Sequence, residues 1–222
     1  MSMLNRVIRL LFPPKCVLCG KVLEDDQTDL CTLCRVDGPD CTGRPGKLPF
    51  LDSWSAVWYY EGNARRSILR YKFYGARGNA ASFGRLLAMK LSREYPEGFD
   101  LLTWVPTGWL RRLFRGYDQV ELLAYAVGAE LEMEPVQLLK KRRNTKPQSR
   151  ITGEAQRRAN VLGAYEICRA ESLEGKRILL LDDVITTGAT AGECARVLLT
   201  AGAKEVHCGA VARARHHGKR SR

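Results

Sequence analysis

Two adjacent carboxylates and the turn of small residues after them form the part of this sequence best suited to chemistry. Asp182 and Asp183 follow the apolar run of residues 177–181. The small residues of the turn are Thr186, Thr187, Gly188, Ala189 and Thr190. Backbone N–H groups in such a turn can converge on an anion at the N-terminus of the next helix. The carboxylates suit ribose hydroxyls or a bound Mg²⁺, so the ligand indicated is a phosphorylated pentose.

A strand-to-helix turn in which an acidic residue only caps the helix is the structural alternative. Capping needs one acidic residue at the start of the helix. Here two carboxylates, Asp182 and Asp183, stand at the end of the strand and precede the turn. The pattern therefore favours a binding site over a cap.

Alternating strands and helices are predicted to position these residues. Apolar and β-branched runs predict strands over residues 54–60, 101–105, 135–139, 177–181 and 205–212. Helical spacing predicts helices over residues 64–73, 80–91, 119–131 and 189–201. This alternation is typical of an α/β fold with a parallel sheet flanked by helices. The carboxyl ends of such strands form the ligand crevice, and Asp182 and Asp183 emerge there.

The stretch over residues 177–190 resembles the signature of the type I phosphoribosyltransferases, which bind 5-phosphoribosyl-1-diphosphate (PRPP). It has a hydrophobic run, Asp-Asp, two hydrophobic residues and Thr-Thr-Gly-x-Thr. The resemblance implies that Asp182 and Asp183 hold the ribose hydroxyls and that residues 186–190 cradle the 5-phosphate. Residues 70–75 resemble the diphosphate loop of the same family, which makes Lys72 the candidate diphosphate contact. The alternative for Lys72 is a solvated basic residue at the end of a helix.

Basic segments between these motifs extend the resemblance to nearly the whole chain. The order of residues 109–123, 146–150 and 157–161 is similar to that of the ComF family, bacterial proteins associated with DNA uptake during competence. In that family a zinc ribbon precedes a phosphoribosyltransferase-like domain. The family pattern Arg-Gly-Phe-Asn-Gln is here Arg115-Gly-Tyr-Asp-Gln119, and Asp118 lowers the local positive charge. Candidates for contact with DNA or diphosphate are Arg111, Arg112, Arg115 and Arg150.

Four cysteines near the start of the chain form two CxxC pairs separated by eleven residues. They are Cys16, Cys19, Cys31 and Cys34. Two such pairs can present four thiolates tetrahedrally to Zn²⁺. Free core thiols and a redox CxxC are the alternatives. A segment this small cannot build a sufficient core, so we expect a structural Zn²⁺ to contribute much of its stability.

Composition divides the chain of 222 residues into three parts. We predict a zinc ribbon with a short N-terminal helix over residues 1–47, a phosphoribosyltransferase-like domain over residues 48–215 and a basic tail over residues 216–222. The polar, basic stretch over residues 142–158 is predicted to be a long loop with a helix starting near Glu154. The formal charge of +12 favours polyanionic ligands. Without a secretion signal or an apolar span, we expect a soluble, cytoplasmic protein.

Two classes of function fit these features. The first is an enzyme that uses Mg²⁺ and transfers phosphoribose from PRPP to a nitrogen nucleophile, with Asp182 or Asp183 stabilising the sugar cation. The second is a non-catalytic scaffold that binds single-stranded DNA during uptake and carries a sensory or vestigial PRPP site. One protein can combine the two functions. The family resemblance also implies that the zinc ribbon docks a helicase-like competence ATPase.

Overall fold

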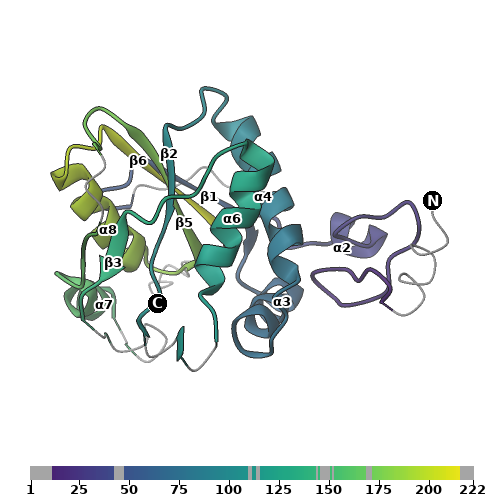
Figure 1. Cartoon of the computed structure of the whole chain (residues 1–222). Helices are drawn as coiled ribbons and strands as arrows, with labels where there is room; N and C mark the ends of the chain where they lie inside the picture. Colours follow the sequence, from purple (N-terminus) through teal and green to yellow (C-terminus); the bar gives the residue numbers. More distant parts are fainter. Residues whose placement is uncertain are drawn as a thin grey trace, which may run out of the picture.

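A four-stranded parallel sheet forms the centre of the protein (Figure 1). The computed structural model describes residues 12–42, 48–109, 112–113, 116–143, 145, 151, 153–168 and 172–215. The sheet has the order β1-β6-β5-β2, and each neighbouring pair is parallel. Its strands are β1 (Ser53–Tyr59), β2 (Leu101–Trp104), β5 (Arg177–Ile185) and β6 (Glu205–Arg213). The predicted parallel α/β sheet is thereby confirmed.

Helices cover both faces of this sheet. One face carries α3 (Gly62–Phe73), α4 (Asn79–Glu94) and α6 (Gln119–Leu131), and the other carries α7 (Glu154–Val161) and α8 (Ala189–Thr200) (Figure 1). Each face has its own hydrophobic core. Because β5 is covered on both sides, its first half is apolar without alternation, and Ile178 to Leu181 are fully buried. The helix predicted over residues 119–131 is confirmed without change.

A small antiparallel pair stands apart from the main sheet and corrects one prediction. Its strands are β3 (Leu139–Lys141) and β4 (Tyr165–Ile167). The predicted strand over residues 135–139 was wrong in its bounds, because Pro135 makes only an isolated bridge to Leu102. Proline has no N–H to donate, so it cannot continue a ladder of backbone hydrogen bonds. The chain leaves β2 there and pairs with β4 instead.

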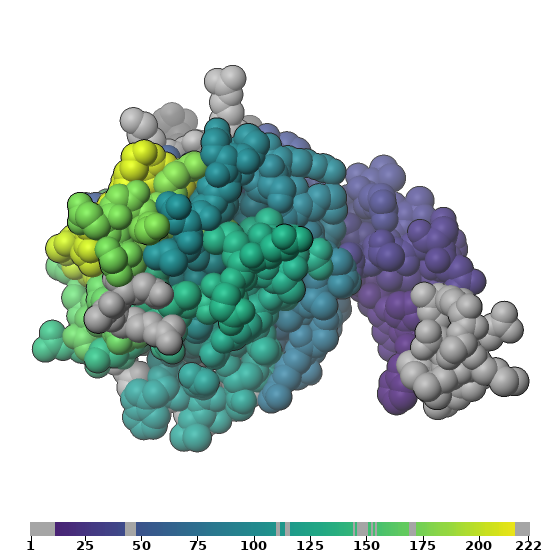
Figure 2. Space-filling view, turned by 45° about the horizontal axis from the view of Figure 1, so that its top comes forward, coloured from purple at the N-terminus to yellow at the C-terminus, as the bar shows by residue number. Residues whose placement is uncertain are grey.

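The N-terminal segment, with its short helix α2 (Thr32–Val36), projects from one side of the body (Figure 2). Side chains of α3 fasten it: Ser67 donates to the carbonyl of Val17, and Arg70 donates to the carbonyl of Leu18 at 2.8 Å. Arg85 of α4 adds an ion pair with Asp29. These bonds join the cysteine-bearing segment to the same core as α3 and α4.

Several sequence predictions fall on residues outside the described ranges. They concern the helix within residues 1–11, the boundary near residue 47, the part of the predicted loop at residues 144, 146–150 and 152, and the tail over residues 216–222. The helix predicted to start near Glu154 is confirmed by α7. Among the described residues, no helix has both the length and the apolar character needed to cross a membrane.

Candidate functional site

A cavity of about 900 Å³ opens at the carboxyl edge of the sheet. The ends of β5 and α3 and the starts of α6 and α8 contribute to its wall. Seven of the predicted PRPP-site residues line it together: Lys72, Asp182, Asp183, Thr186, Gly188, Ala189 and Thr190. The fold thus gathers residues that lie more than 100 positions apart in the sequence.

Thr187 is the predicted site residue that does not line this cavity. Its hydroxyl oxygen accepts a hydrogen bond from the backbone N–H of Ala189 at 3.4 Å. That contact satisfies one of the N–H groups that the first turn of a helix leaves without an intrahelical partner. In this structure Thr187 therefore supports the start of α8.

The two carboxylates lie within β5, which continues beyond them to Ile185. Consecutive side chains of a strand point to opposite faces, so Asp182 and Asp183 face different helices. Asp183 is buried and faces α3 and α6. Asp182 lies on the side of α8 and accepts a hydrogen bond from the backbone N–H of Asp183 at 2.8 Å. Both remain in the wall of the cavity.

Asp183 is held by partners from two helices. Its Oδ1 lies 2.8 Å from the Nζ of Lys72 at the end of α3. Its Oδ2 accepts a hydrogen bond of 2.9 Å from the amide of Gln119, the first residue of α6. Our sequence analysis missed Gln119. The available signal was a polar residue four positions before Leu123, on the apolar face of a predicted helix.

Asp182 has a perturbed acidity. Burial and, second to it, the negative charge of Asp183 together raise the pKa of Asp182 to about 8, although Lys72 acts in the opposite direction. The ammonium of Lys72 therefore neutralises charge on both Asp182 and Asp183. A second cation would favour the ionised form of Asp182. The donor set of two carboxylates thus fits a hard cation such as Mg²⁺.

The turn before α8 requires its glycine. Gly188 has a φ of +77°, a conformation that disfavours any side chain, and an added Cβ would lie 2.8 Å from the side chain of Leu48. The small side chains of residues 186–190 let the start of α8 border the cavity directly. The positive end of the helix dipole favours an anion at this position.

The charge of the cavity wall suits a polyanion. Among the residues that the structure describes, five cationic ones line it: Arg65, Lys72, Arg77, Lys141 and Arg157. Against them stand two carboxylates, those of Asp182 and Asp183. An excess of positive charge in a concave site raises the local concentration of phosphate-rich ligands.

Only one of the four arginines predicted to contact DNA or diphosphate can be placed. Arg112 is exposed and pairs with Glu121 at 3.4 Å. Arg111, Arg115 and Arg150 lie outside the described residues. Trp109, three positions before Arg112, is 64% exposed.

Asp118, where the family pattern has asparagine, performs a structural role. It is buried and caps α6 by accepting from the N–H groups of Val120 and Glu121. Its carboxylate also accepts from the N–H and the hydroxyl of Thr107, at 2.9 and 3.0 Å. The carboxylate therefore ties the loop after β2 to the helix that carries Gln119.

The capping role of Asp118 gives a testable prediction. Asp118→Ala is expected to lower the free energy of unfolding by about 2 kcal/mol, because a helix cap and two further hydrogen bonds are lost. Asp118→Asn is expected to cost about 1 kcal/mol, since the amide oxygen still caps α6 while the NH2 group cannot accept the hydrogen bond from the N–H of Thr107. Urea unfolding of both variants measures this difference. Equal losses in the two variants would contradict the capping role.

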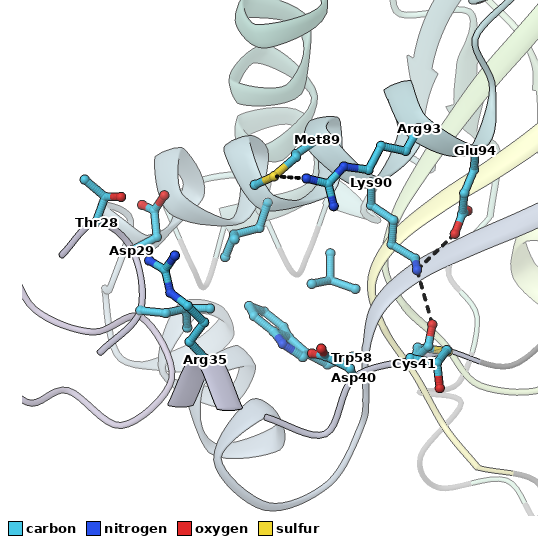
Figure 3. Close-up of a pocket in the computed structure, with 14 residues that line it drawn as sticks. Thr28, Asp29, Arg35, Asp40, Cys41, Trp58, Met89, Lys90, Arg93 and Glu94 are labelled. Carbon is cyan, nitrogen blue, oxygen red and sulfur yellow. Dashed lines mark hydrogen bonds and ion pairs between the residues drawn. The ribbon is translucent and has the colours of Figure 1, made fainter. Parts of the chain in front are cut away.

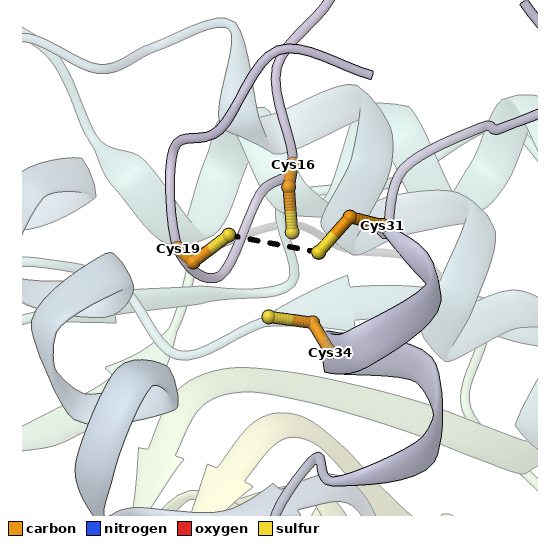
Figure 4. Close-up of side chains that lie close together, drawn as sticks. All are labelled: Cys16, Cys19, Cys31 and Cys34. Carbon is orange, nitrogen blue, oxygen red and sulfur yellow. Dashed lines mark hydrogen bonds between the residues drawn. The ribbon is translucent and has the colours of Figure 1, made fainter. Parts of the chain in front are cut away.

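The four cysteines of the two CxxC pairs come together as predicted (Figure 4). The sulfurs of Cys16, Cys19, Cys31 and Cys34 all lie within 4.8 Å of one another. Those of Cys19 and Cys31 are 3.7 Å apart. A tetrahedral Zn²⁺ with Zn–S bonds of about 2.3 Å places its sulfurs about 3.8 Å apart. The cluster therefore has the donors and the spacing that a structural Zn²⁺ needs.

Thiol acidity in the cluster is uneven. Burial raises the pKa of Cys16, but hydrogen bonds from the backbones of Cys19, Cys31 and Leu18 outweigh it and lower the value to about 7. Burial and the neighbouring thiols raise the pKa of Cys34. Four thiolates at this separation repel one another unless a cation lies between them. The arrangement thus fits a bound metal better than free thiols.

A second, smaller cavity of about 440 Å³ lies between the N-terminal segment and α4 (Figure 3). Several of its charged side chains bind each other or the backbone. Lys90 lies 2.9 Å from the carboxylate of Glu94 and donates to the carbonyl of Cys41. Arg93 contacts the sulfur of Met89 at 3.4 Å. Because this cavity contains none of the predicted ligand-binding residues, the larger one is the candidate site.

Comparison with known proteins agrees with this geometry. The family model described as "Phosphoribosyl transferase domain" matches residues 121–222. The competence protein F of Haemophilus influenzae is 31% identical over 111 residues, which cover 50% of this chain and 48% of that protein. The competence protein ComFC of Streptococcus pneumoniae is 27% identical over 223 residues, covering 86% of this chain and 96% of that protein. Together these matches support a ComF-family, phosphoribosyltransferase-like protein.

A third relative carries a different name. The DNA utilization protein YhgH of Escherichia coli O157:H7 is 26% identical over 200 residues, which cover 86% of each chain. The match to the Haemophilus protein spans about half of that protein's length, whereas the other two alignments run almost from end to end. The phosphoribosyltransferase-like fold that the ComF resemblance implied is thereby confirmed.

Proposed function

We propose that this ComF-family protein binds PRPP with Mg²⁺ in the cavity at the carboxyl edge of the sheet and transfers its phosphoribosyl group. The observation that carries the proposal is the meeting of Lys72, Asp182 and Asp183 beside the turn that begins α8, in one positively charged cavity. The names of its relatives support a role in competence and DNA utilisation.

In the proposed reaction, the bond between C1 of the ribose and the diphosphate oxygen breaks and a bond from C1 to a nitrogen nucleophile forms. The nitrogen loses a proton, and the diphosphate leaves with the electron pair of the broken bond. Residues 186–190 would hold the 5-phosphate, and the two carboxylates would hold the ribose hydroxyls and stabilise positive charge on the sugar. Lys72 would contact the diphosphate. Mg²⁺ would be held near Asp182 and Asp183 and would neutralise charge on the leaving diphosphate.

Calorimetric titration tests the proposal. PRPP with Mg²⁺ is expected to bind the wild type, and Asp182→Asn/Asp183→Asn is expected to bind at least about 100-fold more weakly, because each charged hydrogen bond contributes about 1.5–3 kcal/mol. The matched control is Glu130→Gln/Glu134→Gln, which removes two exposed carboxylates from the far end of α6 and the loop after it. Its PRPP affinity is expected to equal that of the wild type.

Each outcome of the titration points to a different function. Loss of binding in the aspartate variant alone supports the proposed site and directs a search for the nitrogen acceptor. No binding by the wild type favours the second candidate, a scaffold for single-stranded DNA that has kept only the fold. That candidate is favoured by exposed Trp109, which offers a ring for stacking on bases, and by exposed Arg112 nearby.

We further propose that the four cysteines hold a structural Zn²⁺ and that residues 1–47 form a zinc ribbon before the phosphoribosyltransferase-like domain of residues 48–215. The convergence of the four sulfurs supports the metal. As a ribbon fixed to α3 and α4, the segment can present a surface to a partner without contributing to the PRPP cavity. A helicase-like competence ATPase is the partner that the family resemblance suggests.

A further inference from the structure

Both oxygens of the Asp183 carboxylate are already engaged in this structure. Lys72 occupies Oδ1 at 2.8 Å, and Gln119 occupies Oδ2 at 2.9 Å. The three residues come from three elements, β5, α3 and α6. Each oxygen keeps a further lone pair, but the positive charge of the Lys72 ammonium beside Oδ1 opposes the binding of a divalent cation at that oxygen while the ion pair persists.

Of the two partners, Gln119 is the more firmly fixed. It is buried at the first position of α6, next to the buried cap Asp118. Its own backbone carbonyl accepts a hydrogen bond from the hydroxyl of Tyr71. Gln119 therefore acts as a positioning residue that keeps Asp183 oriented.

Lys72 is the partner that can withdraw. It lies in the last turn of α3, and its side chain is 19% exposed to the cavity. Exposed Phe73 and Tyr74 follow it, and then Gly75 with a φ of +69°. A lysine carries its charge on a flexible four-carbon stem, so its ammonium can move by rotation about side-chain bonds alone.

We propose that Lys72 is an exchangeable counter-ion. When the cavity is empty, its ammonium neutralises Asp183 at the position where a divalent cation would otherwise bind. When PRPP and its cation enter, Lys72 releases Asp183 and turns to the diphosphate. The turn of Lys72 to the diphosphate rests on the proposed function. The neutralisation of Asp183 by Lys72 concerns the ligand-free protein alone.

The exchange has two opposite consequences for binding. Without PRPP, Lys72 and a divalent cation compete for the same carboxylate, so removing the ammonium strengthens cation binding. With PRPP, Lys72 and the cation both neutralise the same diphosphate, so removing the ammonium weakens PRPP binding. A residue that served only to stabilise the fold would not change the two affinities in opposite directions.

Titration of Mn²⁺ alone, with the cysteine cluster loaded with zinc, tests the first consequence. Lys72→Met is expected to bind Mn²⁺ about tenfold more tightly than the wild type, within the usual range of coupling between two ligands. Titration of PRPP with Mg²⁺ tests the second, and Lys72→Met is expected to bind about tenfold more weakly. Lys72→Arg keeps the charge and is expected to retain the weak Mn²⁺ binding of the wild type. Arg66→Met is the control, because Arg66 is an exposed cation of α3 outside the cavity.

Mn²⁺ affinity that is unchanged or lower in Lys72→Met overturns the proposal, even where PRPP binding persists. The same conclusion follows if Lys72→Arg binds Mn²⁺ as tightly as Lys72→Met. A wild type that fails to bind PRPP overturns the proposed function, and the Mn²⁺ titration then still decides whether Lys72 is the counter-ion of Asp183. Circular dichroism of each variant distinguishes these results from misfolding.

Discussion

Replacing Cys16 and Cys19 by serine is expected to abolish zinc binding and to unfold residues 12–42, while the parallel sheet stays folded. Structural zinc in small finger peptides has apparent binding free energies of about 10–16 kcal/mol, and most of that energy drives folding. Apart from its bonds to α3 and α4, the N-terminal segment has little to hold its own fold together. Its helix α2 has five residues, and its buried apolar side chains are Val17, Leu18, Leu23, Leu30 and cysteines of the cluster.

Metal analysis and hydrogen exchange measure this effect. The wild type is expected to contain about one zinc per chain and to protect the amides near the cluster. The variant is expected to lose both properties and to retain protection in β5 and β6. Cys168→Ser is the matched control, because Cys168 is an exposed thiol outside the cluster. A variant that still protects residues 12–42, or a wild type with well under one zinc per chain, would reject the zinc proposal.

The second large effect is expected from a single methyl group between α4 and α6. Gly84→Ala is expected to lower the free energy of unfolding by about 2–3 kcal/mol, because overpacked cores force the backbone to shift. A Cβ on Gly84 would lie 2.5 Å from the Cβ of Ala126 and 2.8 Å from its carbonyl carbon. Neither atom belongs to a flexible side chain that could move away.

Urea unfolding of Gly84→Ala and of Gly78→Ala separates this clash from the general effect of replacing glycine. Gly78 precedes α4, has a φ of −57° and has no heavy atom within 4 Å of an added Cβ. Its replacement is expected to change stability by less than about 1 kcal/mol. If Gly84→Ala lowered the free energy of unfolding as little as Gly78→Ala does, α4 and α6 would be able to move apart without cost, contrary to this prediction.

The packing of α4 on α6 also bears on the candidate site. Gln119, which orients Asp183, is the first residue of α6. A shift of α6 away from α4 would move this amide relative to β5. We therefore expect any change that separates α4 from α6 to disturb Asp182 and Asp183. This holds although Gly84 lies in α4 and the two carboxylates lie in β5.

The sequence by itself determined the features that depend on neighbours along the chain. The helix over residues 119–131, the apolar run into Asp182 and Asp183 and the turn around Gly188 are all readable from local pattern. The CxxC spacing similarly predicted that Cys16 and Cys34 would meet. In each case a backbone period or a tight turn fixes the relative positions of residues that are close in the sequence. The residue types therefore reveal the local structure directly.

The tertiary structure alone decided what depends on contacts between distant elements. Local pattern gave Lys72 and Gln119 no reason to meet on Asp183, because the packing of α3 and α6 on one face of the sheet brings them there. For the same reason the sequence indicated only that Asp118 lowers the local positive charge, whereas the structure shows that it is a buried cap of α6. The strand predicted to start at Pro135 gave way to the pairing of β3 with β4. Such contacts arise from the joint packing of several elements, and no single segment of the sequence contains that information.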